Sequence, residues 1–398
     1  MPSDISKTSK HFADISQAAA LKFVVLIGIV SLFADMTYEG ARSITGPYLA
    51  VLGANAVIVG FVIGFGALLG YGLRLVFGYL ADRTAKYWTI TLIGYVCNLL
   101  AVPLLALTSH WATAASLIIM ERVGKAIRTP ARDAMLSHAC QRMGLGWGFG
   151  LHEAFDQTGA MLGPLLVAVI FYFKGSYHES FAILAIPALL ALITLILARW
   201  LYPNPQALEI PKAELEVKSI HSKVYWFYVM GAALIAVGFA DFPLIAYHFA
   251  KASVFPSIWI PVIYAIAMGL SGLTALLCGY FYDRYGFVVL IFVTAFSCWF
   301  AFFTFGNNIK LISIGIILWS VGMGAHDSLM RAVIANLIPI NKRGSAYGIF
   351  NAVYGISLFL GNVIIGALYD VSIASLIVYS IFAQLVAIPF LWTVMKNL

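Results

Sequence analysis

Long apolar stretches, each of about twenty residues or more, recur along the whole chain and are separated by short polar turns. A stretch of ~20 apolar residues is long enough to cross the ~30 Å hydrocarbon core of a bilayer. Because the backbone finds no water there, each stretch is expected to be a helix. The pattern predicts an all-α polytopic membrane protein with twelve transmembrane helices, at 18–46, 55–80, 87–108, 111–136, 145–173, 178–201, 224–249, 255–281, 287–306, 309–336, 344–369 and 373–395.

One long polar segment interrupts this pattern in the middle of the chain. Residues 202–223 contain Pro203, Pro205 and Pro211, followed by charged residues, a composition typical of a linker. The segment divides the predicted helices into two groups of six. We therefore expect four parts: an N-terminal tail at 1–17, a six-helix bundle at 18–201, the linker at 202–223 and a second six-helix bundle at 224–398.

The composition indicates that lipid surrounds most of the chain. It is 62% hydrophobic and 10% charged, whereas a soluble domain carries about 25% charged residues. The net charge of +7 does not indicate a nucleic-acid partner, because the basic residues gather in alternate loops. This distribution follows the positive-inside rule. It predicts an integral protein of a bacterial inner membrane with both termini and the linker in the cytoplasm.

A charged turn occurs twice in the chain, once in each predicted bundle. The first copy reads Gly-Tyr-Leu-Ala-Asp-Arg-Thr-Ala-Lys from Gly78, and the second reads Gly-Tyr-Phe-Tyr-Asp-Arg-Tyr-Gly from Gly279. Further matches follow in the same order: Phe33-Ala-Asp35 with Phe239-Ala-Asp241, Arg132 with Arg331, Gly150 with Gly348, and Gly163 with Gly361. Ordered matches of this kind indicate an internal duplication.

With the duplicated turn between predicted helices 2 and 3 and again between 8 and 9, the chain resembles the major facilitator superfamily over essentially its whole length. The resemblance implies two pseudo-symmetric six-helix bundles, a substrate site between them and transport by alternating access. It also implies that the turns hold the cytoplasmic side closed, through Gly78, Asp82, Arg83, Gly279, Asp283 and Arg284. Ala85 stands where the family has a glycine, whereas the second copy keeps Gly286.

The fifth predicted helix resembles the antiporter motif of drug–proton exporters in that family. The matching residues are Gly150, Gly159, Gly163 and Pro164. Val167 and Ala168 stand in place of the usual trailing glycine pair. Glycine-rich membrane helices also pack closely for structural reasons alone, so the motif favours export only slightly.

Ionisable residues inside predicted membrane helices are candidates for function, because they are costly to hold there. Asp35, Glu39 and Arg42 lie on one face of the first helix. We expect Asp35 to carry the proton, with Asp241 at the matching place in the repeat, and Glu39 to form either a gate or a structural pair with Arg42. The full set of proton-coupling candidates is Asp35, Glu39, Glu121, Asp156, Asp241 and His152, of which His152 and Asp156 share a face and are candidates for a proton relay.

The fourth predicted helix carries several bases. Arg122, Lys125 and Arg128 would favour anionic substrates if they line a cavity. Alternatively, the lower bases follow the positive-inside rule and Glu121 is only a counter-ion. The other substrate-cavity candidates are Glu153, Gln157, His326 and Asp327.

The predicted function is secondary active transport of a small organic solute, coupled to protons, with a slight preference for export. The alternative is a carrier or importer of an organic anion, such as a carboxylate solute or a siderophore. An embedded enzyme or a channel is a remote alternative, since the sequence has no His-Glu-x-x-His or paired-cysteine motif and its duplication is a two-bundle one. We expect no cofactor and no metal, and a monomer whose partners are a small molecule, protons and lipid.

Overall fold

The computed structural model describes residues 3–140, 145–204, 223–337 and 343–397, and it shows only helices, turns and loops in these ranges. The side chains of residues 3–17, 145–147, 149, 283, 327, 331, 332, 335, 336 and 343–345 lie outside the description. Two predicted site residues, Asp283 and Asp327, therefore lie outside the described side chains.

The helices fall into an N-terminal and a C-terminal half, on either side of residues 205–222. The N-terminal half contains α1 (Ser3–Val51), α2 (Ala56–Thr84), α3 (Tyr87–Leu104), the short 3-10 helix η1 (Leu105–Leu107), α4 (Trp111–Cys140), α5 (Leu145–Lys174), α6 (Tyr177–Ile183) and α7 (Ala185–Leu201). The C-terminal half contains α8 (Lys223–Gly238), α9 (Phe242–Lys251), α10 (Trp259–Tyr285), α11 (Val288–Ser297), α12 (Phe300–Thr304), α13 (Ile309–Leu337), α14 (Arg343–Val371) and α15 (Ile373–Lys396).

Ten helical stretches in the described part are long and apolar enough to cross a membrane. Two further predicted spans are helical but do not meet that criterion. α4 carries Glu121, Arg122, Lys125 and Arg128 along its middle. The stretch Val288–Thr304 is too short to meet the criterion, and a turn at 298–299 divides it into α11 and α12. The all-α polytopic fold expected from the sequence is confirmed.

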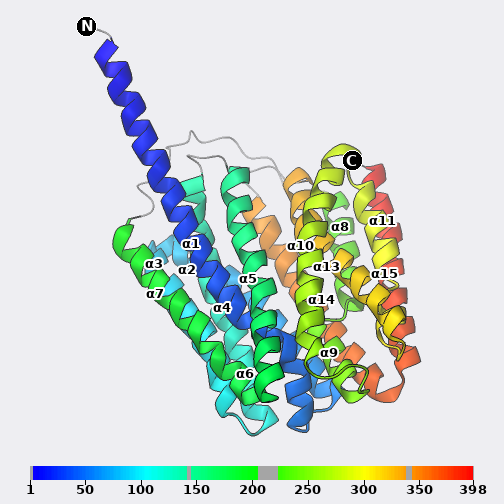
Figure 1. Cartoon of the computed structure of the whole chain (residues 1–398). Coiled ribbons are helices and arrows are strands. Elements are labelled where there is room, and N and C mark those ends of the chain that lie inside the picture. Colours follow the sequence, from blue (N-terminus) through cyan, green and yellow to red (C-terminus); the bar gives the residue numbers. More distant parts are fainter. Residues whose placement is uncertain (1–2, 141–144, 205–222, 338–342, 398) are drawn as a thin grey trace.

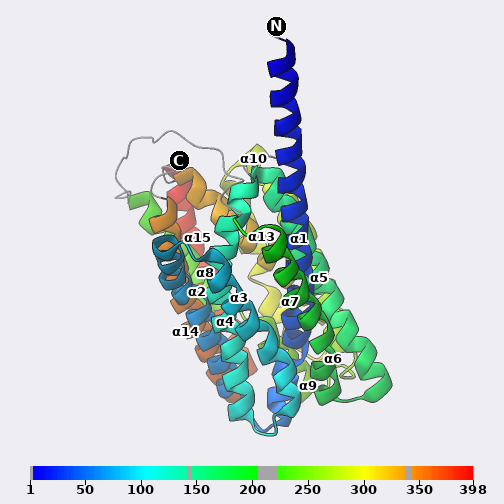
Figure 2. The same ribbon diagram turned by 90° about the vertical axis from the view of Figure 1, so that its left-hand side faces the viewer.

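The two chain termini lie at the same end of the molecule, here called the termini end (Figure 1). α1 runs from this end to the opposite end, here called the far end, where α9 also lies (Figures 1 and 2). α1 is helical from Ser3, and its first turns project beyond the bundle. The division of the chain into a tail, two bundles and a linker stays a prediction.

The seventh predicted span, 224–249, is not one continuous helix as expected, because Phe239, Ala240 and Asp241 separate α8 from α9. Asp241 caps the N-terminus of α9, and a proline follows within its first turn. Side chains of the C-terminal half donate hydrogen bonds to the backbone carbonyl groups that the helix break leaves free. Trp319 Nε1 donates to the carbonyl of Ala240 at 2.9 Å, and Ser380 Oγ donates to that of Gly238 at 2.6 Å.

Close glycine contacts support the internal duplication. A methyl group on Gly163 of α5 would lie 2.2 Å from the carbonyl oxygen of Met36 on α1. In the other half, a methyl group on Gly361 of α14 would lie 2.4 Å from the carbonyl oxygen of Val237 on α8. The first and fifth predicted spans of each half therefore pack in the same way, with glycine in both cases permitting backbone contact.

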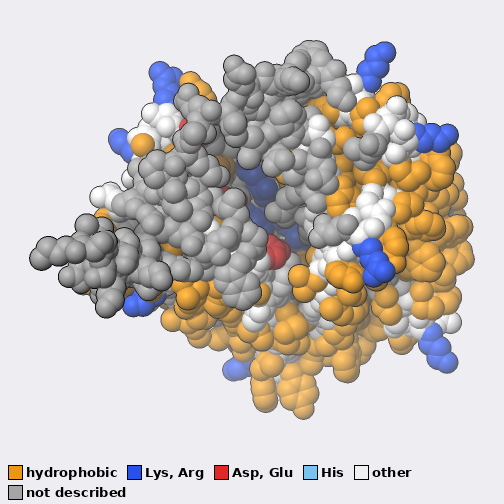
Figure 3. Space-filling model, turned by 90° about the horizontal axis from the view of Figure 1, so that it is seen from above, with side chains coloured by type: hydrophobic (Ala, Val, Ile, Leu, Met, Phe, Trp, Pro, Cys, Tyr) orange, Lys and Arg blue, Asp and Glu red, His pale blue; other side chains and the backbone are white. Residues whose placement is uncertain are grey.

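Glycines also bring the two halves together at the far end. A methyl group on Gly46 of α1 would lie 1.8 Å from the carbonyl oxygen of Pro243 on α9, and one on Gly60 of α2 would lie 2.2 Å from that of Asn362 on α14. Seen from the termini end, by contrast, the surface is hollowed, and acidic and basic side chains are visible inside the hollow (Figure 3). The halves therefore close tightly at the far end and leave a charged hollow at the termini end.

Candidate functional site

Tyr38 connects an acid on α1 with a base on α4. Its hydroxyl donates a hydrogen bond to Oδ1 of Asp35, one turn earlier on the same helix. The ammonium group of Lys125 lies 3.9 Å from the centre of the Tyr38 ring, within range of a cation–π interaction. Asp35 and Tyr38 are buried, at 7% and 5% exposure, whereas Lys125 is half-buried. Asp35 thus has a hydroxyl, not a cation, as its hydrogen-bond partner, and it interacts with Lys125 and Arg128 electrostatically.

Arg128 is fully buried between aromatic rings. Its Cζ lies 4.2 Å from the centre of the Tyr95 ring and 5.7 Å from that of Tyr38. α3 and α4 touch here, since a methyl group on Gly94 would lie 2.5 Å from the backbone nitrogen of Arg128. Nε, Nη1 and Nη2 of Arg128 have no hydrogen-bond partner in the described part of the chain. Buried donors left unpaired are costly, so the environment of this guanidinium is incomplete.

A second polar cluster joins α1, α4 and α5. Ser31 Oγ lies 2.8 Å from Nε2 of His152 and accepts a hydrogen bond from Nη1 of Arg132 at 3.2 Å. Nδ1 of His152 lies 3.6 Å from Oδ2 of Asp156. Arg132 also holds Asp133, with Nη2 2.8 Å from Oδ1. The structure thus brings His152 and Asp156 together as the sequence predicts, while their role as a relay stays a prediction.

A bridge of polar side chains joins the two halves. Nη2 of Arg42 on α1 lies 2.5 Å from Oδ1 of Asp241, and its Nη1 lies 3.4 Å from Oε1 of Glu39. The hydroxyl of Tyr264 on α10 donates to Oε2 of Glu39 at 2.5 Å. The predicted pairing of Glu39 with Arg42 is confirmed, and the structure adds two partners from the C-terminal half.

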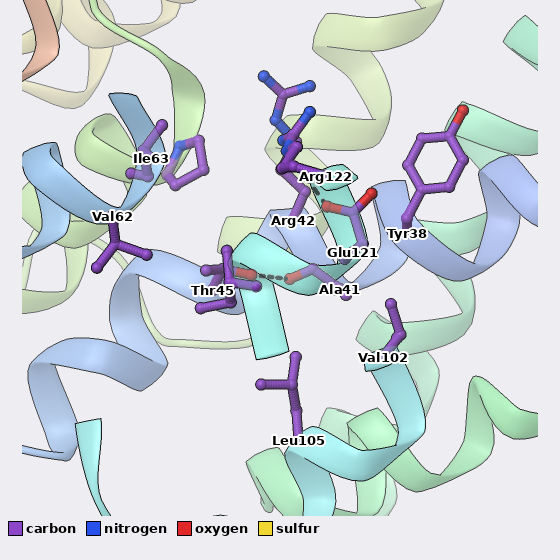
Figure 4. A pocket seen from close by; sticks show the side chains of 12 residues that line it. Tyr38, Ala41, Arg42, Thr45, Val62, Ile63, Val102, Leu105, Glu121 and Arg122 are labelled. Carbon is purple, nitrogen blue, oxygen red and sulfur yellow. Dashed lines mark hydrogen bonds and ion pairs between the residues drawn. The ribbon is translucent and has the colours of Figure 1, made fainter. Parts of the chain in front are cut away.

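A small pocket lies beside this bridge, lined in part by Tyr38, Arg42, Glu121 and Arg122 (Figure 4). Nε of Arg122 lies 3.2 Å from Oε2 of Glu121, and Nδ2 of Asn98 donates to Oε1 of Glu121 at 2.9 Å. Glu121 is therefore a counter-ion for Arg122. The free space is about 20 Å³, room for one or two water molecules, so this pocket does not accommodate an organic solute in the present conformation.

Asp35 and Asp241 do not occupy matching places, contrary to the expectation from the repeat. The glycine contacts align Met36 with Val237. Asp35 precedes Met36 by one residue, whereas Asp241 follows Val237 by four residues. Asp241 also lies at a helix break, while α1 continues through Asp35. Similar short sequences therefore stand at different depths in the two halves, and Asp241 serves the bridge to Arg42.

The first charged turn lies where α2 ends, at the termini end. Asp82 and Arg83 are exposed. Oδ1 of Asp82 accepts a hydrogen bond from the Tyr87 hydroxyl at 3.3 Å, and Nη1 of Arg83 donates to the Tyr79 hydroxyl at 3.4 Å. A methyl group on Gly78 would lie 3.5 Å from Cβ of Pro130, an ordinary contact. Within the described residues, the hydrogen bonds of Asp82 and Arg83 stay on α2 and the start of α3.

The second charged turn lies at the end of α10, beside α13. A methyl group on Gly279 would lie 3.6 Å from Oγ of Ser328, and Cζ of Arg284 lies 5.7 Å from the ring centre of Tyr285. The side chain of Asp283 lies outside the described residues. A closing role for either turn remains a prediction for another conformation.

The glycines of the predicted antiporter motif have a packing role. A methyl group on Gly159 would lie 2.2 Å from the carbonyl oxygen of Leu32, and Gly163 meets the next turn of α1 in the same way. A methyl group on Gly150 would have no neighbour within 4 Å. Pro164 follows inside the same helix. This packing accounts for Gly159 and Gly163 without reference to the direction of transport.

The remaining cavity candidates are spread over both halves. Gln157 Nε2 donates to Oε1 of Glu153 at 2.9 Å, and Gln157 lies 3.4 Å from the position of a methyl group on Gly272 of α10. The ring of His326 lies 5.1 Å from that of Phe239, and neither ring nitrogen has a hydrogen-bond partner in the described part. The side chain of Asp327 lies outside the described residues. Of the described candidates, Glu153, Gln157 and His326 are not among the groups that act on Asp35.

Sequence reasoning missed four polar residues that organise the site: Ser31, Tyr38, Tyr95 and Asn98. Tyr38 was detectable, since it follows Asp35 by one turn on a face already rich in charge. Tyr95 and Asn98 gave no signal, because single polar residues in an apolar helix are common and their partners come from α4.

Two helical halves that close at one end and carry buried charges in between have the architecture of a membrane carrier. The family model of the Major Facilitator Superfamily matches residues 27–362. The chain belongs to the Major Facilitator Superfamily, and it is a membrane transporter.

Relatives and solved structures agree with this assignment. The chain is 40% identical over 382 residues to an uncharacterised protein of Mycobacterium tuberculosis, covering 94% of this chain and 93% of that protein. It is 26% identical over 365 residues to an uncharacterised MFS-type transporter of Methanocaldococcus jannaschii, covering 88% and 89%. A shorter match of 163 residues, 38% of this chain and 32% of the relative, is 28% identical to the benzoate transport protein of Acinetobacter baylyi.

Among solved structures, the nucleoside transporter NupG has a TM-score of 0.71 at 13% identity, over 94% of this chain and 98% of that one. A bacterial homologue of the human lysosomal transporter Spinster has a TM-score of 0.72 at 12% identity, over 95% and 97%. These similarities show the fold.

Proposed function

We propose that this chain is a proton-coupled secondary transporter that moves a small organic solute by alternating access, with Asp35 as the group that carries the proton. The environment of Asp35 carries this proposal. It is a buried acid in the membrane part of α1, and its hydrogen-bond partner is the Tyr38 hydroxyl. A carboxyl group with a neutral partner is not locked in its ionised form as a salt-bridged one is. It is therefore suited to bind and release a proton.

The polar cluster around His152 supports a route for that proton. Asp156 interacts electrostatically with Asp35, and His152 lies between Asp156 and Ser31, 3.6 Å from the former and 2.8 Å from the latter. A histidine and a carboxyl group exchange a proton once they reach hydrogen-bond distance or are bridged by one water molecule. We infer that this cluster exchanges the proton of Asp35 with the hollow.

The closure of the far end supports alternating access. The positive-inside distribution favours cytoplasmic termini, and on that assignment the present conformation is open to the cytoplasm. The Spinster homologue of similar fold is in an inward-facing and unoccupied conformation. For the far end to open, the Arg42–Asp241 and Glu39–Tyr264 contacts must break.

The test compares Asp35→Asn with Asp370→Asn, a matched removal of an acid that pairs with Lys251 at the far end. Each protein is reconstituted in vesicles under an imposed pH gradient, and a trapped pH dye reports proton movement as acids, amines and neutral solutes are added. We expect solute-dependent proton movement in the native protein and in Asp370→Asn, and its loss in Asp35→Asn. Equal proton movement in the two variants would place the coupling group elsewhere.

A second candidate function, a carrier of an organic anion, is favoured by the two bases that lack an acid partner, Lys125 and Arg128. The partial match to the benzoate transport protein points the same way. The slight preference for export rested on the α5 glycines, which pack against α1. The environment of Asp35 is compatible with both import and export.

A further inference from the structure

Lys125 and Arg128 differ from the other bases around them. Three neighbouring arginines each have a carboxylate partner: Arg42 with Asp241 at 2.5 Å, Arg122 with Glu121 at 3.2 Å and Arg132 with Asp133 at 2.8 Å. Lys125 and Arg128 make no ion pair with any residue that the structure describes. Instead, they lie against the faces of Tyr38 and Tyr95.

The acids near these two cations act on them only from beyond ion-pair distance. Asp35 is the first acid to attract Lys125, and it also attracts Arg128. Glu39, the next acid along α1, is held by Arg42 and by the Tyr264 hydroxyl. Asp156 on α5 also attracts both cations, although Arg132 attracts it more strongly. The two cations therefore share Asp35 and Asp156 with Arg132, and these two acids repel each other. Buried charge without a partner is strongly destabilising, so a bound anion would relieve a cost already built into the fold.

We propose that Lys125 and Arg128 bind the negatively charged group of the transported solute, a small organic anion such as a carboxylate, and that this anion binds together with a proton on Asp35. The inference rests on the proposed function and adds two properties to it, the charge of the solute and the sign of its coupling to the proton.

The coupling follows from the shared position of Asp35. When Asp35 is ionised, it compensates the charge of Lys125 and competes with the anion for it. When Asp35 is protonated, this competition is removed and Asp156 is the remaining acid that attracts the two cations. By reciprocity, a bound anion favours protonation of Asp35 to the same degree. Proton and anion then move in the same direction, which is the opposite of the antiport that the α5 glycines favoured from sequence.

The two cations contribute in different ways. Lys125 is half-buried and so offers the first contact to an incoming anion. Arg128 is fully buried, with three nitrogens that have no hydrogen-bond partner in the described part, and it adds charge and donors behind Lys125. The ring of Tyr38 lies against both cations while its hydroxyl holds Asp35. A change at the carboxyl group is therefore transmitted directly to the anion site.

Several other ionisable groups interact with Asp35 and therefore influence how readily it binds a proton. They are Tyr38 from α1, Lys125 and Arg128 from α4, and Asp156 with its neighbour His152 from α5. Asp241 and Tyr264, from the C-terminal half, face Arg42 and Glu39 instead. Since Asp35 and Asp156 repel each other when both are ionised, the test replaces Asp35 and keeps Asp156.

The experiment measures equilibrium binding to the purified full-length protein in detergent, without a gradient. The probes are acid and amide pairs of the same shape: acetate and acetamide, benzoate and benzamide, succinate and succinamide. Each is measured in a neutral and in a mildly acidic buffer in which the acids remain ionised. The variants are Asp35→Asn, Lys125→Gln and Arg128→Gln, with Lys251→Gln, a half-exposed far-end lysine, as the matched control. Thermal unfolding checks that each variant is folded, and Lys125→Gln carries the test if the buried Arg128→Gln is not.

We expect at least one acid to bind and its amide not to bind, with affinity about 5–150-fold tighter in the acidic buffer. Asp35→Asn should show the tight affinity in both buffers, and Lys125→Gln should lose about tenfold or more. Binding of no acid, equal binding of an amide, affinity that does not tighten on acidification, or an equal loss in Lys251→Gln would each overturn the inference. In that case vesicles can still show proton movement with a neutral or cationic solute, which separates this failure from that of the proposed function.

Discussion

Arg42 and Asp241 form an ion pair across the two halves of the molecule, with Nη2 2.5 Å from Oδ1. The two side chains are 13% and 16% exposed, and they lie close to where Gly46 meets Pro243 backbone to backbone. The pair therefore contributes to the closed far end, and it exists only while the halves are together.

Breaking this pair is expected to open the far end. Removing one partner of a buried ion pair costs about 3–5 kcal/mol, and here the cost falls on the closed conformation alone. Arg42→Gln should therefore increase labelling of a cysteine placed at Thr45, a buried neighbour in the small pocket, by an impermeant maleimide added from the far side. Lys251→Gln is the control, because Lys251 and Asp370 both belong to the C-terminal half. Equal labelling in the two variants would show that the Arg42–Asp241 pair does not hold the far end closed.

Tyr38 offers a way to separate the hydroxyl from the ring. Tyr38→Phe deletes the hydrogen bond to Asp35 and keeps the ring beside Lys125, so it should shift the pH dependence of transport while leaving the solute affinity within about threefold. Tyr38→Leu deletes both, and loss of the cation–π contact should weaken folding stability by a further ~1 kcal/mol. Transport profiles across pH and melting curves report the two effects. Identical pH profiles for native protein and Tyr38→Phe would contradict the assigned hydrogen-bond role.

The α5 glycines give a stability prediction with an internal control. Gly163→Ala forces a methyl group to within 2.2 Å of the Met36 carbonyl oxygen, and such overpacking typically costs about 1–3 kcal/mol. Gly150→Ala meets nothing within 4 Å in the same helix and should be neutral or stabilising by up to about 1 kcal/mol. Melting temperatures in detergent distinguish the two. Equal stability would mean that α1 and α5 are not packed as closely as described.

Much of the fold was predictable from the sequence, because the length of each apolar stretch and the duplicated turn can be read from contiguous residues. The twelve predicted segments each correspond to helix, and the glycine pairs at Gly163 and Gly361 pack in the same way. The break between α8 and α9 was missed because hydropathy stays high across Phe239 and Ala240, and hydropathy does not report a capping residue such as Asp241.

The site was less predictable, because its partners are distant in sequence. The pair of Glu39 with Arg42 lies within one turn and was expected, whereas Asp241 and Tyr264 reach the same cluster from the other half. Matching Asp35 to Asp241 by their shared tripeptide was wrong for a related reason. A short motif identifies residue types but not their depth in the membrane, and a break in a helix changes the depth of the residues that follow it.

Asp241 has one further property that bears on how easily the halves separate. Its Oδ1 accepts from Arg42 and also, at 2.8 Å, from the backbone nitrogen of Phe242 at the start of α9. When Arg42 withdraws, the carboxylate keeps the second donor and the positive end of the α9 dipole. The Arg42–Asp241 ion pair can therefore break while the Asp241 carboxylate stays compensated. The far end can then open and close repeatedly while α9 remains folded.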